Sequence, residues 1–239
     1  MKNPPVVILV PGLWLGGWAW DEVVEHLARD GFPAVAVTLP GLESPATRRH
    51  GIGLSDHVAA VTDAIRDAAG PVILVAHSGA GALATAVLDQ NPDLVRHVVY
   101  VDSGPVADGT IARPDLDPLT VELPFPTWTE LQAGGASLDG LSEEMLQRFE
   151  THAVAHPAGP LRDPVCLNNP ARNQVPTTLV CCSIPSAVVK QMATGGGMFA
   201  ALADLTNTHY ADLPTGHWPM WSAPDELAKI IVETARLTL

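Results

Sequence analysis

The chain has 239 residues, of which 47% are hydrophobic and 16% are charged. A chain of this length and composition can bury one sizeable core, so we expect a single domain over residues 1–239. The formal net charge is −13, and a negative field of this size argues against nucleic acid or an anionic membrane surface as a partner. We therefore expect a small molecule as the partner, and we leave a homodimer open.

Membrane and metal signals are weak in this sequence. No segment approaches the roughly 18 apolar residues of a membrane span, and the first apolar stretch, residues 6–10, is too short for a signal peptide. The three cysteines, two of them adjacent at Cys181 and Cys182, form neither a disulfide framework nor a metal-binding spacing. We expect a cytoplasmic protein without a metal or other cofactor.

Short β-branched apolar runs alternate with amphipathic stretches of helical period along most of the chain. The expected strands are residues 6–10, 34–38, 72–76, 95–101, 177–182 and 208–212. The expected helices are about residues 20–29, a helix capped by Ser55, residues 79–89, and a last helix from Pro224. This alternation predicts an α/β fold with a mostly parallel sheet of about six strands and helices on both faces.

The long stretch over residues 103–175 contains no convincing strand and many prolines. Within it, Ser142 is expected to start a helix that runs through Met145, Leu146 and Phe149. Long insertions over a compact core are usually functional lids. We therefore expect residues 103–175 to form a cap inserted in the single domain.

Ser78 has the sequence surroundings of a nucleophile. It follows the apolar run 72–76 and precedes a stretch of small residues, which is the layout of a strained turn that exposes a hydroxyl group between a strand and a helix. The positions two before and two after such a serine must be small, and here they are Ala76 and Ala80 in place of the commoner glycines. A serine that merely caps a helix would look similar, but the position after the third expected strand favours the nucleophile.

His217 is the expected base. It lies in a Gly-His turn between the last expected strand and the last expected helix, where such a fold brings a base over the serine. The other histidines compete less well: His77 is expected to pack beside the serine, and His152 and His156, in the cap, could contact substrate but are expected at the surface. The remaining five histidines are interpreted as surface or structural residues: His26, His50, His57, His97 and His209.

The glycine-rich segment 10–20 follows the first expected strand. Its backbone can bring amide groups to a ligand oxygen, and we expect Leu13 and Gly79 to donate the two N–H groups of an oxyanion hole. Trp18 and Trp20 are expected to pack the first helix. The candidate residues for contact with substrate are Trp14, Trp128, Trp218 and Met220.

These motifs together resemble the α/β-hydrolase superfamily, in particular its compact branch of esterases and hydroxynitrile lyases. The resemblance covers about residues 5–102 and 175–237 and rests on Pro11-Gly12, His77-Ser78-Gly79 and Gly216-His217. It implies an α/β-hydrolase fold and cofactor-free hydrolysis of esters, lactones or amides. The cap resembles no member whose substrate could be carried over.

In this family an acidic residue usually completes a catalytic triad with the serine and the histidine. Here that acid does not stand at the family's usual position. After the strand 177–182 the chain reads Ser183-Ile184-Pro185 and offers no carboxylate. In haloalkane-dehalogenase-like members the acid ends the preceding strand, and here Asp102 stands at that position. We predict Asp102 as the acid that orients His217; the alternative is that it only caps the following turn, and Asp108, Asp204 and Asp212 are weaker rivals.

The residues thus predict a serine hydrolase that cleaves a small, largely uncharged carboxylic ester or lactone through an acyl-enzyme. Two alternatives stay open. One is a hydroxynitrile-lyase-like lyase that uses Ser78 and His217 as a proton relay. That branch commonly places a lysine near the base, and no lysine lies near His217 in this sequence, which disfavours the lyase. The other is a small-molecule receptor on the same scaffold.

Overall fold

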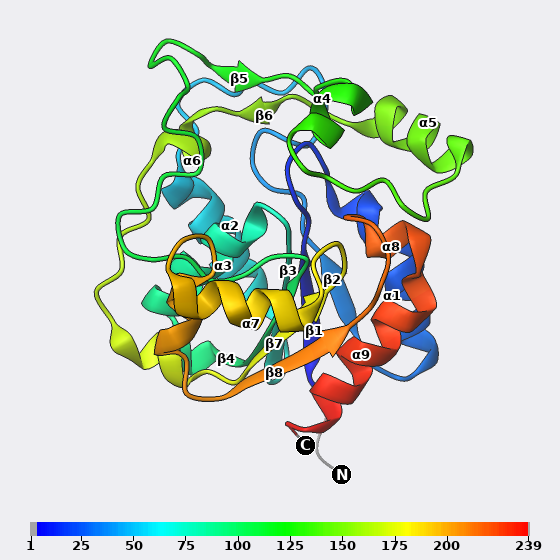
Figure 1. Ribbon diagram of the computed structural model, residues 1–239, viewed down its shortest axis with the longest axis vertical. Helices are drawn as coiled ribbons and strands as arrows, with labels where there is room; N and C mark the ends of the chain where they lie inside the picture. The colour runs from blue at the N-terminus through cyan, green and yellow to red at the C-terminus, as the bar shows by residue number, and fades with distance from the viewer. Residues whose placement is uncertain (1–3, 239) are drawn as a thin grey trace.

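A six-stranded parallel sheet forms the centre of the computed structural model, which describes residues 4–238 (Figure 1). In spatial order the strands are β2 (Ala34–Ala36), β1 (Val6–Val10), β3 (Val72–His77), β4 (Val95–Val101), β7 (Thr177–Cys181) and β8 (Thr208–Asp212). Every neighbouring pair in this sheet is parallel. The predicted α/β fold is therefore confirmed, with β2 two residues shorter than expected.

Helices cover both faces of the sheet because successive side chains of each strand point to opposite sides. Val6, Ile8 and Val10 of β1 pack into one buried core, whereas Val7 and Leu9 pack into the other. The first core is closed by α2 (Leu54–Asp67), α3 (Ala80–Gln90) and α7 (Ser186–Gly195). The second is closed by α1 (Asp21–Arg29), α8 (Pro219–Ser222) and α9 (Pro224–Arg236).

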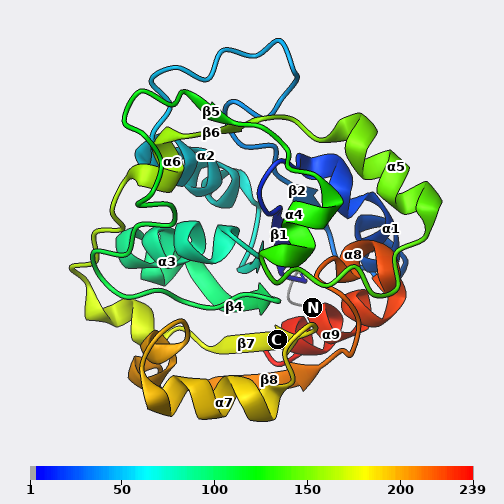
Figure 2. The same ribbon diagram turned by 45° about the horizontal axis from the view of Figure 1, so that its top comes forward.

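Residues 122–162 of the expected cap run over the edge of the sheet at which the parallel strands end (Figure 2), and we call residues 103–175 the cap from here on. The last residues of this stretch descend to the end of α3, where the Asp89 carboxylate accepts from the Asn168 and Asn169 amides. The elements within residues 122–162 are β5 (Glu122–Leu123), α4 (Trp128–Ala133), α5 (Glu143–His152), β6 (His156–Pro157) and α6 (Gly159–Arg162). The expected helix after Ser142 is present, and the Ser142 hydroxyl accepts a hydrogen bond from the Met145 amide. The expectation of no strand is wrong, because β5 and β6 pair antiparallel. Two-residue strands carry no periodicity that a sequence could reveal.

Two further details differ from expectation. Helix α2 begins at Leu54 with Gly53 as its N-cap, so Ser55 lies inside the helix. The first turn is held instead by two carboxylates, since Asp56 accepts from the Gly53 amide and Asp163 accepts from the Leu54 amide. Helix α7 was not expected, and short 3₁₀ helices also occur at Gly17–Trp20, Pro92–Leu94, Pro170–Gln174 and Ala200–Asp204.

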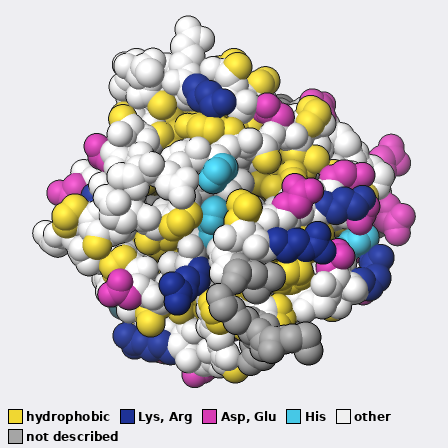
Figure 3. All heavy atoms as spheres, turned by 90° about the horizontal axis from the view of Figure 1, so that it is seen from below, with side chains coloured by type: hydrophobic (Ala, Val, Ile, Leu, Met, Phe, Trp, Pro, Cys, Tyr) yellow, Lys and Arg dark blue, Asp and Glu magenta, His cyan; other side chains and the backbone are white. Residues whose placement is uncertain are grey.

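The face of the molecule opposite the cap carries the two termini. Hydrophobic, basic and acidic side chains are interspersed on it (Figure 3). Within residues 4–238, no helix combines the length and the hydropathy that crossing a bilayer requires.

Candidate active site

Ser78 lies in a strained turn between β3 and α3. Its φ angle is +54°, a left-handed conformation that non-glycine residues rarely adopt and that is often found at functional sites. The Ser78 amide donates to the Val101 carbonyl (3.1 Å), which ties the turn to the end of β4. Ala76 and Ala80 on either side are both buried, as the steric argument required.

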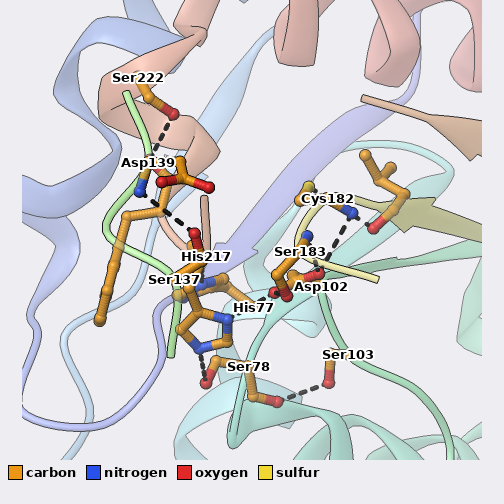
Figure 4. Close-up of polar contacts among 12 residues, drawn as sticks. His77, Ser78, Asp102, Ser103, Ser137, Asp139, Cys182, Ser183, His217 and Ser222 are labelled. Carbon is orange, nitrogen blue, oxygen red and sulfur yellow. Dashed lines mark hydrogen bonds and ion pairs between the residues drawn. The ribbon is translucent and has the colours of Figure 1, made fainter. Parts of the chain in front are cut away.

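The structure brings Ser78, His217 and Asp102 into one chain of hydrogen bonds (Figure 4). His217 Nε2 lies 2.7 Å from Ser78 Oγ, and His217 Nδ1 lies 2.6 Å from Asp102 Oδ2. An ionised carboxylate can only accept a hydrogen bond, so the His217 ring carries its proton on Nδ1 and donates it to Asp102. Nε2 is then left to accept from the serine hydroxyl. This is the arrangement in which a histidine can take the proton of a serine.

Asp102 is held by several donors besides His217. The Cys182 amide (3.2 Å) and the Ser183 amide (2.9 Å) donate to Oδ1, and the Ser183 hydroxyl donates to Oδ2 (2.5 Å). Burial alone would raise the pKa of the Asp102 carboxyl, but the hydrogen bonds from His217 and Ser183 outweigh it and lower that pKa. Asp102 therefore stays ionised, although its side chain is only 7% exposed.

The contact of Ser183 with Asp102 was not predicted from the sequence. Ser183 occupies the position at which the family usually has its acid, and it binds the carboxylate that comes from the neighbouring strand instead. The signal was present in the parallel register, because residues that follow adjacent strands β4 and β7 lie side by side. The alternative was that Asp102 only caps the turn that follows it. Its partners are instead His217 and the residues at the end of β7, Cys182 and Ser183.

The loop that carries His217 is held by the cap. The His217 amide donates to the Ser137 carbonyl (2.8 Å), and the Gly216 amide donates to the Asp139 carbonyl (3.0 Å). On the core side, His77 Nε2 donates to the His217 carbonyl (2.7 Å). Burial, with the nearby His217, lowers the pKa of His77 to about 3, so this ring stays neutral and acts as a donor. His77 thus packs, as predicted, and also fixes the loop.

Gly216 is needed because this loop approaches the cap closely. A Cβ atom there would lie 2.5 Å from the Asp139 carbonyl oxygen and 2.7 Å from the Ser137 carbonyl oxygen. We predict that Gly216→Ala displaces His217 and lowers kcat about 100-fold, since a misplacement of about 1 Å can cost that much. The control is Gly195→Ala, where a Cβ meets no atom within 4 Å. Equal kcat values for the two variants would contradict this account of the loop.

The predicted oxyanion donors lie together beside Ser78. A Cβ atom on Gly79 would be 3.0 Å from Leu13 Cδ2, so the two loops are in contact. Among the described turns and loops, neither the Leu13 amide nor the Gly79 amide donates a backbone hydrogen bond. Trp14, the next residue of the first loop, has a φ angle of +65°. Both amides are thus available to a ligand oxygen, which is the geometry an oxyanion hole needs.

Two cavities meet at Ser78 and His217. The first, of about 400 Å³, extends between Asp102 and Phe199. The second, of about 470 Å³, extends over Trp14 and towards the cap. Their walls are mostly hydrophobic, with Arg113 and Glu130 as the charged residues of the second cavity.

The four aromatic or sulfur-containing candidates for substrate contact divide evenly. Trp14 and Trp218 line the second cavity. Met220 does not line either cavity, because the helical turn of α8 directs it into the core, where it is fully buried. Trp128 stands behind the wall and packs edge-to-face on Trp218, with ring centroids 6.3 Å apart.

Two histidines of the cap have different surroundings. His152 is exposed, as expected, and its ring lies against Trp18. The expectation of a surface position is wrong for His156, which is only 3% exposed. In the part of the chain that the structure describes, no cluster of three metal-ligating side chains is present.

Comparison with known proteins agrees with this architecture. A sequence model of the alpha/beta hydrolase family matches residues 7–230. A probable hydrolase, R7, from Phoma sp. is 24% identical over 249 residues, which cover 97% of this chain and 98% of that protein. A carbendazim hydrolyzing esterase from Nocardioides sp. is 31% identical over 98 residues, about 40% of each chain. The crystal structure of an Arabidopsis methylesterase superposes with a TM-score of 0.74 and 16% identity, covering 98% of this chain and 99% of that one.

The family model spans nearly the whole chain, and the structure has the sheet and the strained serine turn described above. The chain belongs to the alpha/beta hydrolase family. The predicted membership of the α/β-hydrolase superfamily is thereby confirmed.

Proposed function

We propose that this protein is a serine hydrolase that cleaves a small, largely uncharged carboxylic ester or lactone through an acyl-enzyme. The observation that carries the proposal is the unbroken chain of hydrogen bonds from Ser78 Oγ through His217 to Asp102. The strained φ angle of Ser78 and the free amides of Leu13 and Gly79 support it. The esterases among the relatives give it further support.

The proposed reaction has two halves. Ser78 Oγ attacks the carbonyl carbon while its proton passes to His217 Nε2, and the carbonyl oxygen takes up negative charge between the Leu13 and Gly79 amides. The bond to the leaving oxygen then breaks, and His217 returns the proton to that oxygen. Water then attacks the acyl carbon while one of its protons passes to His217. The bond from that carbon to Ser78 Oγ breaks, His217 returns the proton to Oγ, and the acid product leaves.

Asp102 stabilises the imidazolium that forms in each half. Its carboxylate accepts the Nδ1 proton and holds the ring in the tautomer that can receive the serine proton. Because its pKa is lowered, this negative charge is kept below the pH at which an ordinary aspartate is protonated.

The two cavities indicate the kind of substrate. With Ser78 between them, one can take the acyl group and the other the leaving group of a substrate that has apolar parts on both sides of the ester. Most of their walls are hydrophobic, for example Val106, Phe199 and Trp218, and the chain carries a net charge of −13. Both features disfavour an anionic substrate.

We therefore expect an uncharged ester to be preferred to its charged analogue. In a matched pair of substrates, one with a free carboxylate near the scissile bond and one with that carboxylate as its methyl ester, the methyl ester should have the higher kcat/KM, by about tenfold or more. Steady-state kinetics on the pair measures this at one ionic strength. A higher kcat/KM for the free carboxylate would contradict the proposed preference.

A panel of p-nitrophenyl esters of graded acyl length, together with several lactones, tests the function as a whole. A hydrolase should release p-nitrophenol in a burst stoichiometric with the protein when deacylation is slow. A lyase or a receptor should show no burst. The lyase has little support from the chain, because neither Lys190 nor Lys229 lines the two cavities: Lys190 lies over the Tyr210 ring and Lys229 pairs with Asp225.

A further inference from the structure

Trp14 follows the proposed oxyanion donor Leu13 and is bound by the cap at three points. Its amide donates to His156 Nδ1 (3.4 Å), and its carbonyl accepts from the Val154 amide (2.9 Å). Its indole Nε1 donates to the Leu123 carbonyl (3.1 Å). These contacts join segments more than 100 residues apart in the sequence.

The three partners belong to one small piece of sheet. Leu123 of β5 and His156 of β6 are direct neighbours in the antiparallel pair, and Val154 precedes β6. Trp14 is thus attached to the end of this pair through its amide, its carbonyl and its side chain. Its left-handed φ angle of +65° is unfavourable for a tryptophan, so surrounding contacts must hold it.

His156 is suited to accept from an amide. Its ring is buried and lies 5.7 Å, centroid to centroid, from the His57 ring at nearly a right angle. Burial lowers the pKa of His156 to about 3, with further lowering by His57 and Arg49. A neutral ring whose proton is on Nε2 leaves Nδ1 free to accept. The ring also borders a cavity of about 30 Å³ that Leu13 and Gly79 line.

We propose that His156 is a positioning residue that, through Trp14, holds the oxyanion loop so that the Leu13 amide points at the developing oxyanion. This inference rests on the proposed hydrolase function. The cap then does more than cover the site, because β5 and β6 set the conformation of a loop of the core. The hydrogen bond from the Trp14 indole to the Leu123 carbonyl also holds the oxyanion loop in this conformation.

Esters and their thionoesters separate this role from a structural one. Sulfur is a weaker hydrogen-bond acceptor than oxygen, so the oxyanion donors assist a C=O substrate more than the matching C=S substrate. We expect His156→Leu to lower kcat for the ester by about 10 to 100-fold, with little change in KM. The rate on the thionoester should fall much less, so the ester-to-thionoester ratio of kcat/KM should drop about tenfold or more.

Matched variants complete the design. His156→Asn offers an amide oxygen near the place of Nδ1 and should restore most of the ratio. His97→Leu removes a similarly buried imidazole that hydrogen-bonds the Thr178 hydroxyl instead of the oxyanion loop, and it should leave the ratio unchanged. If His156→Leu does not fold, Trp14→Phe removes the bond to Leu123 but keeps an aromatic ring, and it should lower the ratio in the same way.

Three results would overturn the inference. One is an unchanged ratio in folded His156→Leu, or in Trp14→Phe where the first variant does not fold. Another is an equal fall of the ratio in His97→Leu, which would mark a general effect of removing a buried imidazole. The last is a wild-type protein that cleaves no ester at all, which refutes the proposed function and the inference together and is seen before any variant is made.

Discussion

Replacing Ser78 with alanine is expected to lower kcat on an activated ester by about 10⁴ to 10⁶-fold, leaving only the contributions of binding and of the oxyanion hole. The reason is that the strained turn presents a single hydroxyl to His217 Nε2, at 2.7 Å. A fluorophosphonate probe should label the wild type and leave Ser78→Ala unlabelled.

The matched control for this variant is Ser55→Ala, which removes an exposed hydroxyl from α2. Its kcat and its labelling should equal those of the wild type. Labelling of Ser78→Ala at another serine, or an unchanged kcat, would show that the nucleophile has been misassigned.

Asp102→Asn is expected to lower kcat by about 10³ to 10⁴-fold. The asparagine keeps the shape of the side chain, but it cannot supply two acceptor oxygens to Ser183 and to His217 Nδ1 at once. If its NH₂ group faces Nδ1, the ring must carry its proton on Nε2, and the serine proton then has no acceptor. Steady-state kinetics on a good ester, with circular dichroism to confirm folding, measures the effect.

Ser183→Ala is the informative companion to that variant. It removes one hydrogen bond and leaves the charge of Asp102 in place, so kcat should fall by about tenfold only. Two of the rival acids have other partners: Asp212 accepts from the Ser186 amide and hydroxyl, and Asp108 accepts from the Leu167 amide. A near-normal kcat for Asp102→Asn would mean that the acid lies elsewhere or that the protein works with a Ser-His pair.

The fold could be predicted because its signals are local. Apolar runs such as residues 72–76 and the helical period of Val58, Val61 and Ile65 are properties of short windows, and the structure forms β3 and α2 there. The meeting of Ser78, Asp102 and His217 could also be predicted, since each follows a strand of one parallel sheet. Their catalytic roles remain predictions.

The contacts between the cap and the core could not be predicted in this way. His156 binds a residue 142 positions away, and a lone histidine among prolines gives no sign of burial. The prediction that Met220 contacts substrate was wrong for a related reason. A hydrophobic residue near the base fits a pocket wall and a core equally well until the turn of α8 is known. Pairings across long sequence distances depend on tertiary packing, which no local pattern contains.

Trapping of the acyl-enzyme tests the central claim most directly. The protein is mixed with an excess of a p-nitrophenyl ester, quenched with acid during the burst, digested and analysed by mass spectrometry. We predict that the peptide containing Ser78 gains the mass of the acyl group in the wild type and that no peptide gains it in Ser78→Ala. Ester hydrolysis without any adduct on Ser78, or with an adduct on another residue, would contradict the account.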